Sequence, residues 1–326
     1  MKVRIENFLF ILLLFSFSFF YISAQEKQNS PVQNEDCGLT DLPLVQLNVS
    51  VSSSKNGYLK DLTDKDFEIY DGKERQEIEY FKQENKPASI GVLFDLSGSV
   101  TSYTNDSFSE APYAVKGLET FLNQTNPDND YFLIGFSDKI KLFLDTTKDV
   151  KKVQETLNEL LKIKPEGNTN FYDALEIGFD KIKKSTSNKK VLILITDGLD
   201  TSSQKANLSN VEKIAKQQNV LLYMVNILTK DDFRDINTLE YAENKSGSLI
   251  KNSGGRIFYS KKTEDINEVF AMLAEELKTQ YTIGFTPKTS SKKNQWRKIE
   301  VKVQIPKEKK KEVGKVSVRT KKEIYF

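Results

Sequence analysis

The pattern of apolar and polar positions changes twice along this chain. Between residues 44 and 86, apolar residues alternate with polar ones, a period of two that is typical of half-buried β-strands. The clearest run is Val45, Leu47, Val49 and Val51. The turn dipeptides Asn56-Gly57 and Asp71-Gly72 separate the alternating segments. We therefore expect an antiparallel β segment over residues 43–87.

From residue 88 to residue 283, short apolar runs alternate with amphipathic segments. The apolar runs are Ile90–Phe94, Tyr131–Phe136, Val191–Ile195 and Val220–Val225. Such runs are typical of parallel strands that are buried on both faces. The intervening segments place apolar residues three or four positions apart, which indicates helices with one buried face, the last of them starting at a Thr263 cap. The alternation predicts an α/β fold with a Rossmann-like, doubly wound, mostly parallel sheet over residues 88–283.

Residues 284–326 return to the period of two, and Ile299, Val301, Val303 and Ile305 are an example. The charged run Lys307–Glu312 interrupts them, and we interpret it as a solvated loop, with a surface for an anionic partner as the alternative. Strand edges at both ends of the α/β region need partners. We therefore expect residues 43–87 and 284–326 to pack together as a small antiparallel β unit that flanks the α/β domain.

The first 24 residues have the pattern of a signal peptide. Two basic residues precede an apolar run from Phe8 to Ile22, and Ala24 offers a small residue for cleavage. The run is shorter than the roughly 20 residues of a membrane span, so a retained anchor is the less favoured alternative. Residues 25–42 are polar without a period and predict a linker. We expect an exported protein, in the periplasm, at the cell surface or secreted, with no integral membrane span after cleavage.

The composition excludes several kinds of chemistry. The chain has no histidine and a single cysteine, Cys37, which excludes histidine-based triads, histidine-ligated zinc and an intrachain disulfide. Lys+Arg number 48 against 46 Asp+Glu, so a net charge of +2 gives no reason to expect nucleic acid as a partner. A metal site in this chain must therefore use oxygen ligands, which favours Mg²⁺, Mn²⁺ or Ca²⁺.

Five side chains with oxygen atoms stand where such a site is expected. Asp95, Ser97 and Ser99 follow the first buried strand, Asp197 follows the third, and Thr169 directly precedes a helix. Ligands of doubly wound sheets bind beyond the carboxyl ends of the strands, where the strand order reverses. An isolated aspartate at a strand end is more simply a turn or a cap. Five oxygen groups from three such loops instead fit a hard divalent cation, with Mg²⁺ first.

The order Asp95-x-Ser97-x-Ser99, then Thr169, then Asp197 resembles the metal-ion-dependent adhesion site of von Willebrand factor type A domains and of integrin inserted domains. The resemblance implies that the three hydroxyl groups bind the ion directly or through water and that the two aspartates supply charge. It also implies that an acidic side chain of a protein partner completes the coordination.

The remainder of the chain, from about residue 45 to residue 326, resembles the bacterial VWFA-related family. The segments that carry this resemblance are Leu62–Phe67, Tyr70–Lys73, Phe171–Leu175 and Ser253–Gly255. One departure is Val100, where many members of that family have methionine.

We therefore expect an exported, metal-dependent protein-binding module without enzymatic activity. One alternative is a structural or assembly protein of the envelope that uses its β segments. A less favoured alternative is a Mg²⁺-dependent phosphoryl-transfer enzyme, because haloacid-dehalogenase-like phosphatases need a second acid where Ser97 stands. The chain also has no glycine-rich phosphate loop.

Overall fold

The computed structural model describes residues 44–98, 111–226, 246–259, 265–288 and 295–325, all of which belong to one compact unit spanning Asp41–Phe326. The predicted signal peptide (1–24), the predicted linker (25–42) and the predicted cap Thr263 lie outside the described residues. Within these described ranges, no helix is long and apolar enough to cross a membrane.

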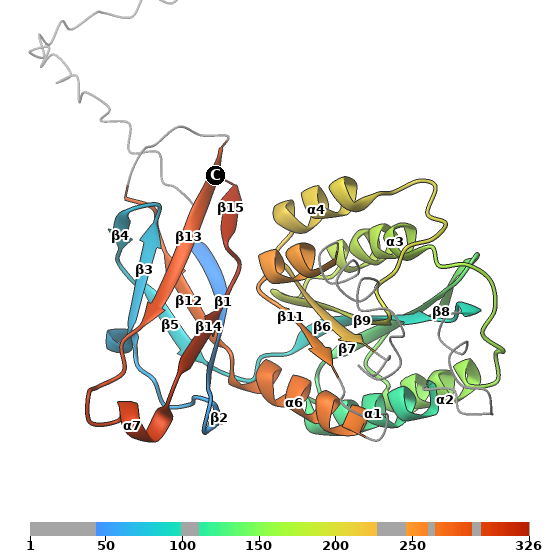
Figure 1. The fold of residues 1–326 in the computed structure, drawn as a ribbon, viewed down its shortest axis with the longest axis horizontal. Helices are drawn as coiled ribbons and strands as arrows, with labels where there is room; N and C mark the ends of the chain where they lie inside the picture. The colour runs from blue at the N-terminus through green and yellow to red at the C-terminus, as the bar shows by residue number, and fades with distance from the viewer. Residues whose placement is uncertain (1–43, 99–110, 227–245, 260–264, 289–294, 326) are drawn as a thin grey trace, which may run out of the picture. The chain divides into compact units, whose positions relative to one another are not determined.

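A six-stranded sheet forms the centre of the α/β part (Figure 1), with the order β11-β10-β9-β6-β7-β8. The strands are β6 (Ala88–Asp95), β7 (Asp130–Phe136), β8 (Ile140–Thr147), β9 (Lys189–Thr196), β10 (Val220–Asn226) and β11 (Arg256–Tyr259). Neighbouring strands run parallel except for β7 and β8. Every residue of β6 is buried, as expected for a strand covered on both faces.

Helices cover both faces of this sheet (Figure 1). They are α1 (Ala111–Gln124), α2 (Val150–Leu160), α3 (Phe171–Lys183), α4 (Leu208–Gln217) and α6 (Ile266–Thr279). Apolar residues of α1, α2 and α6 share one core with the sheet, whereas those of α3 and α4 share the core on the other face. The prediction of a doubly wound, mostly parallel sheet is confirmed.

The sequence prediction lacks several elements of the α/β part, among them β8, β11 and α4. Strand β8 is an edge strand whose residues are all at least partly exposed, so it lacks the continuous apolar run by which the other strands are recognised. In the C-terminal segment, the short helix α7 (Lys310–Val313) overlaps the second half of the run Lys307–Glu312 that we interpreted as a loop. The backbone N–H of Val313 donates to the carbonyl of Lys309 at 2.9 Å, which closes one helical turn.

The two β segments form two antiparallel sheets over a common core, which confirms that they pack together. The first sheet has the order β14-β1-β12-β5, with β2 paired to β1, and the second has the order β15-β13-β3-β4. Their N-terminal strands are β1 (Val45–Ser53), β2 (Gly57–Tyr58), β3 (Phe67–Asp71), β4 (Glu74–Gln76) and β5 (Tyr80–Gln83). Their C-terminal strands are β12 (Tyr281–Phe285), β13 (Trp296–Val303), β14 (Val316–Arg319) and β15 (Glu323–Tyr325).

Strand β12 crosses the boundary that the sequence pattern places at residue 283. It directly follows α6, yet its partners are β1 and β5 of the β unit. The first half of β1 pairs with β12, from Val45 opposite Phe285, and its second half pairs with β14, from Ser50 opposite Arg319. Strand β1 therefore depends on two separate C-terminal strands.

A buried carboxylate on α6 joins the α/β part to the β unit. Glu276 is fully buried and accepts hydrogen bonds from Ser50 Oγ at 3.0 Å, Tyr223 Oη at 3.0 Å and Arg319 Nη2 at 2.6 Å, and also from the hydroxyl of Tyr58. Burial alone would raise the pKa of this carboxyl, but the charge of Arg319 and these hydrogen bonds hold it below the ordinary value of 4.5. Glu276 is therefore a paired, structural charge.

Candidate metal centre

The candidate centre lies where the order of the strands reverses. Strand β6 pairs with β7 on one side and with β9, which comes later in the chain, on the other. Phe94 lies opposite Ile195, so the two parallel strands end at the same edge of the sheet. Asp95 ends β6 and Asp197 follows β9, and both side chains are fully buried. This edge is the position at which doubly wound sheets bind ligands.

Two neighbouring groups hold the carboxylate of Asp95. The backbone N–H of Ser97 donates to Oδ1 at 2.9 Å, and the hydroxyl of Thr196 donates to Oδ2 at 2.7 Å. Burial and, after it, the negative charge of Asp197 raise the pKa of the Asp95 carboxyl from 3.8 to about 7, against these hydrogen bonds. The charge of Asp197 is therefore close enough to disfavour the charged form of Asp95.

The loop after β9 is shaped around Asp197. The backbone N–H of Leu199 donates to Asp197 Oδ1 at 2.9 Å, and that of Gly198 donates to the hydroxyl of Thr196 at 3.1 Å. Gly198 has a φ of +82°, and a Cβ atom there would lie 2.5 Å from the methyl carbon of Met224. Only glycine fits this turn without strain, and the methyl group of Met224 packs directly beneath the loop.

Backbone hydrogen bonds join the Thr169 loop to both aspartate loops. On one side, Gly98 N–H donates to the carbonyl of Gly167 at 3.0 Å. On the other side, Thr201 N–H donates to the carbonyl of Thr169 at 3.0 Å, and Thr169 N–H donates to Thr201 Oγ1 at 2.8 Å. The side chain of Thr169 is only 2 % exposed. The structure thus brings the three loops together at one edge of the sheet.

Two further aspartates, which the sequence interpretation missed, position these loops. The carboxylate of Asp173, in the first turn of α3, accepts hydrogen bonds from three successive backbone N–H groups, those of residues 204–206, at 2.7–3.2 Å. Asp138 Oδ1 accepts a hydrogen bond from Asn168 N–H at 2.9 Å, just before Thr169. An acid in the first turn of a helix is a recognisable capping signal, whereas nothing in the sequence indicates the contact of Asp138.

Four of the five predicted ligands are described. Asp95, Ser97, Thr169 and Asp197 lie on the three connected loops, and Ser99 lies outside the described residues. Nowhere in the described ranges do three or more His, Cys, Asp or Glu side chains gather in a group that fits a metal ion. A centre at this edge therefore has two carboxylates and must take its remaining ligands from hydroxyl groups and water.

This arrangement fits a hard divalent cation. The negative charge of Asp197 raises the pKa of Asp95, and a cation beside the two buried carboxylates would offset that repulsion. Carboxylate and hydroxyl oxygens are the ligands that Mg²⁺ prefers, and Mg²⁺ usually keeps several waters. The same set lacks the sulfur and nitrogen donors of a structural zinc site.

Residues 90–199 match the sequence model of the von Willebrand factor type A domain. The chain carries a von Willebrand factor type A domain. The matched range begins in β6 and ends just after Asp197, so all five predicted ligands of the type A domain fall within it. The wider resemblance of residues 45–326 to the bacterial VWFA-related family extends beyond this range and stays a prediction.

Solved structures of low sequence identity are similar to the chain. An aerotolerance-related membrane protein of Bacteroides fragilis is 12% identical, with a TM-score of 0.46, over 59% of this chain and 98% of that chain. The PilB minor pilin of Streptococcus sanguinis is 14% identical, with a TM-score of 0.47, over 60% of this chain and 62% of that chain. The pilus adhesin SpaC of Lactobacillus rhamnosus GG is 15% identical, with a TM-score of 0.48, over 76% of this chain and 47% of that chain. Because these TM-scores are below 0.5, the domain assignment rests on the match over residues 90–199.

Proposed function

We propose that the type A domain holds a divalent cation, Mg²⁺ first, and uses it to bind an acidic side chain of a protein partner. The proposed ligands are Asp95, Ser97, Ser99, Thr169 and Asp197. The observation that carries the proposal is the pair of fully buried aspartates at the ends of β6 and β9, with the Thr169 loop hydrogen-bonded to both of their loops.

The residues of this chain divide the task between them. Thr196 donates to Asp95 Oδ2 and thereby fixes the orientation of that carboxylate. Thr169 N–H and its carbonyl are both engaged by Thr201, which holds the Thr169 residue in place. The two carboxylates would only just neutralise a bound divalent cation and would leave no excess negative charge at the centre. A coordination position that stays open could then accept a partner's carboxylate.

Binding, and not turnover, is the proposed role. A serine nucleophile needs an adjacent general base, and this chain has no histidine to act as one. Phosphatases of the haloacid dehalogenase type also require a second acid two residues after the first. In this chain that position, two residues after Asp95, is Ser97.

Titration calorimetry on the chain from Gln25 to Phe326 tests the metal centre directly. We expect Mg²⁺ or Mn²⁺ to bind the wild type and not Asp95→Ala or Asp197→Ala. Asp145→Ala is the matched control, since Asp145 belongs to the same domain but is 77 % exposed and pairs with Lys181. Equal binding by the wild type and Asp95→Ala would remove the proposal.

Capture of partners with and without a chelator tests the role of the cation. We expect partner proteins that are retained in Mg²⁺ and released by EDTA, and that Asp95→Ala does not retain. Partners that stay bound in EDTA would instead support a structural role of the β unit.

We further propose that the protein acts outside the cytoplasm, because residues 1–24 have the pattern of a signal peptide. Amino-terminal sequencing of the exported protein should begin at Gln25. A start at Met1 in the membrane fraction would indicate a retained anchor.

A further inference from the structure

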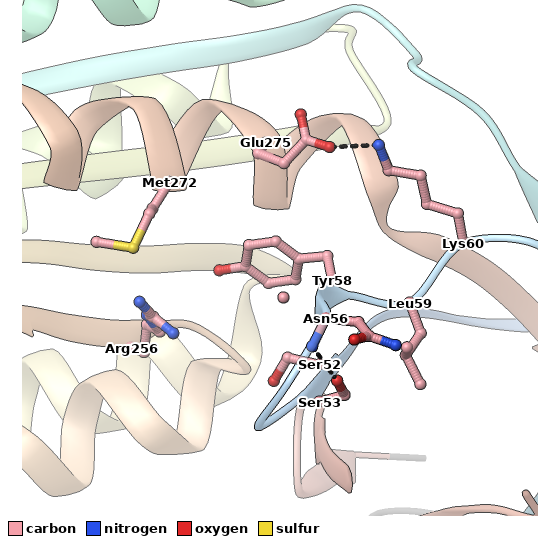
Figure 2. A pocket seen from close by; sticks show the side chains of 10 residues that line it. Ser52, Ser53, Asn56, Tyr58, Leu59, Lys60, Arg256, Met272 and Glu275 are labelled. Carbon is pink, nitrogen blue, oxygen red and sulfur yellow. Dashed lines mark hydrogen bonds and ion pairs between the residues drawn. The ribbon is translucent and has the colours of Figure 1, made fainter. Parts of the chain in front are cut away.

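A groove of about 690 Å³ lies between the β1–β2 hairpin and α6 (Figure 2). None of the proposed metal ligands lines it. One wall is formed by the hairpin, including Tyr58 and Lys60, and the other by Met272 and Glu275 of α6. Arg256, the first residue of β11, completes the groove beside the ring of Tyr58. The groove therefore combines an apolar surface with one guanidinium group.

The guanidinium of Arg256 is held in place but has no acceptor for its hydrogen bonds. Its Cζ lies 3.8 Å from the centroid of the Phe258 ring, which fixes the plane of the group. Its Nε is buried without a hydrogen-bond partner, and within the described part of the chain no group accepts a hydrogen bond from this side chain. The side chain is 29 % exposed, so the fork of donors is accessible from the groove.

The nearest acid, Glu276, is already satisfied by other groups. Arg256 Nε is 3.9 Å from Glu276 Oε2, which is beyond hydrogen-bond distance. Glu276 instead accepts hydrogen bonds from Arg319 Nη2 at 2.6 Å and from three hydroxyl groups. Two arginines therefore face one carboxylate, and one positive charge remains without a matched negative charge.

The other charged residues that line the groove, Lys60 and Glu275, are paired with each other. Lys60 Nζ lies 2.6 Å from Glu275 Oε1, as Figure 2 shows, and Lys278 Nζ lies 3.0 Å from Glu275 Oε2. Met272 is 44 % exposed and gives the groove an accessible apolar surface. The groove thus offers one unmatched guanidinium beside an exposed apolar surface.

We propose that this groove docks a segment of a protein partner that carries a carboxylate next to an apolar side chain. A fixed guanidinium binds a carboxylate through two parallel hydrogen bonds. The neighbouring apolar side chain would cover Met272 and the ring of Tyr58. The docking depends on charge complementarity at Arg256 and is independent of the metal centre.

Two methionines make the test specific. Of the three methionines, Met1 belongs to the predicted signal peptide, Met272 lines the groove, and Met224 packs beneath the Gly198 loop of the metal centre. Methyl-¹³C-methionine NMR on the chain from Gln25 to Phe326 therefore reports on the groove and on the metal centre separately. The probe is the capped tetrapeptide Gly-Glu-Leu-Gly, with Gly-Gln-Leu-Gly and Gly-Glu-Gly-Gly as matched controls.

We expect the Glu-Leu peptide to shift the Met272 methyl signal saturably, in EDTA as well as in Mg²⁺, and in EDTA to leave the Met224 signal in place. Replacing Glu by Gln or Leu by Gly in the peptide should weaken binding roughly tenfold or more. The variant Arg256→Lys, which keeps the charge but loses the fork, should weaken it similarly, and Arg256→Gln should abolish it. Arg75→Gln, at an exposed arginine outside the groove, should have no effect.

Three results would overturn the docking proposal. One is an unchanged Met272 signal at saturating peptide. Another is equal binding by Arg256→Lys and Arg256→Gln variants whose Met224 signal shows that they are folded. The third is equally tight binding of hexanoate, which would assign the groove to a free carboxylic acid. The variant Asp95→Ala separates this inference from the proposed metal centre. It should lose the Mg²⁺-induced shift of the Met224 signal and keep the response of the Met272 signal to the peptide.

Discussion

Asp95 and Glu276 are both fully buried carboxylates, but the protein surrounds them in opposite ways. Glu276 is paired with Arg319 and three hydroxyl groups, and its pKa is lowered. Asp95 has hydrogen-bond donors but also the charge of Asp197 nearby, and its pKa is raised to about 7. A buried acid whose charge is matched stabilises the fold, whereas a buried acid beside a second acid lacks a positive charge. That difference distinguishes the structural position from the candidate metal centre.

The largest expected effect is on metal affinity. Asp95→Ala should lower the affinity for Mg²⁺ by more than about 100-fold, because it removes one of the two carboxylates that we propose as ligands. Glu276→Gln should change that affinity by less than about twofold, since the hydrogen bonds of Glu276 among the described residues go to strands β1, β2, β10 and β14 and not to the three loops. Calorimetry on both variants measures the contrast. Comparable losses in the two variants would mean that the two acids belong to one coupled system.

For the stability of the fold, we expect the substitution of Glu276 to matter more than that of Asp95. Glu276→Ala should lower the free energy of unfolding by about 3–5 kcal/mol, because it leaves the charge of Arg319 buried without its partner. Glu275→Ala is the matched control on the same helix, since Glu275 is 35 % exposed and should cost about 1 kcal/mol or less. Urea denaturation of the wild type and of the two variants measures both losses. Equal losses would show that Glu276 is not a structural charge.

Thr196→Val sharpens the comparison at the metal centre. The variant keeps the shape of the side chain but removes the hydrogen bond to Asp95 Oδ2. Loss of such an orienting contact should weaken Mg²⁺ binding about tenfold. Thr146→Val, at an exposed position of β8, serves as the control for the same substitution. An unchanged affinity in Thr196→Val would show that the orientation of Asp95 does not depend on this hydroxyl.

The smallest expected effect is a dependence on pH. The pKa of Glu276 is lowered from 4.5 in the folded protein, so the folded state binds this proton less tightly than the unfolded state does. The contribution of Glu276 to stability is therefore fully present above pH 4.5 and is lost as the pH falls below it. The difference in unfolding free energy between the wild type and Glu276→Gln should shrink over that range. A constant difference would contradict the assigned pairing.

The sequence predicts the central strands and the loops of the candidate centre because both have strong local signals. Apolar runs such as Val191–Ile195 and the acids that follow them are visible without any tertiary information. The role of Thr196 cannot be seen in the sequence, because it depends on the pairing of β9 with β6. Glu276 offered a weaker signal, since it lies three residues after Leu273 and thus on the buried face of α6. Its hydrogen-bond partners come from four strands, β1, β2, β10 and β14, and no local pattern indicates them.

The pairing of β1 also constrains the order in which the chain can fold. Strand β1 is among the first described segments, but its partners β12 and β14 come from the far end of the sequence. Contacts between such distant segments require closure of a long loop and form slowly. The type A domain lies between β1 and β12 and closes shorter loops between its strands, the longest being the one that pairs Ala88 of β6 with Lys189 of β9. During synthesis, the edges of the early strands therefore stay unpaired until β12 and β14 have been made, and in this period they are exposed to aggregation or to chaperones.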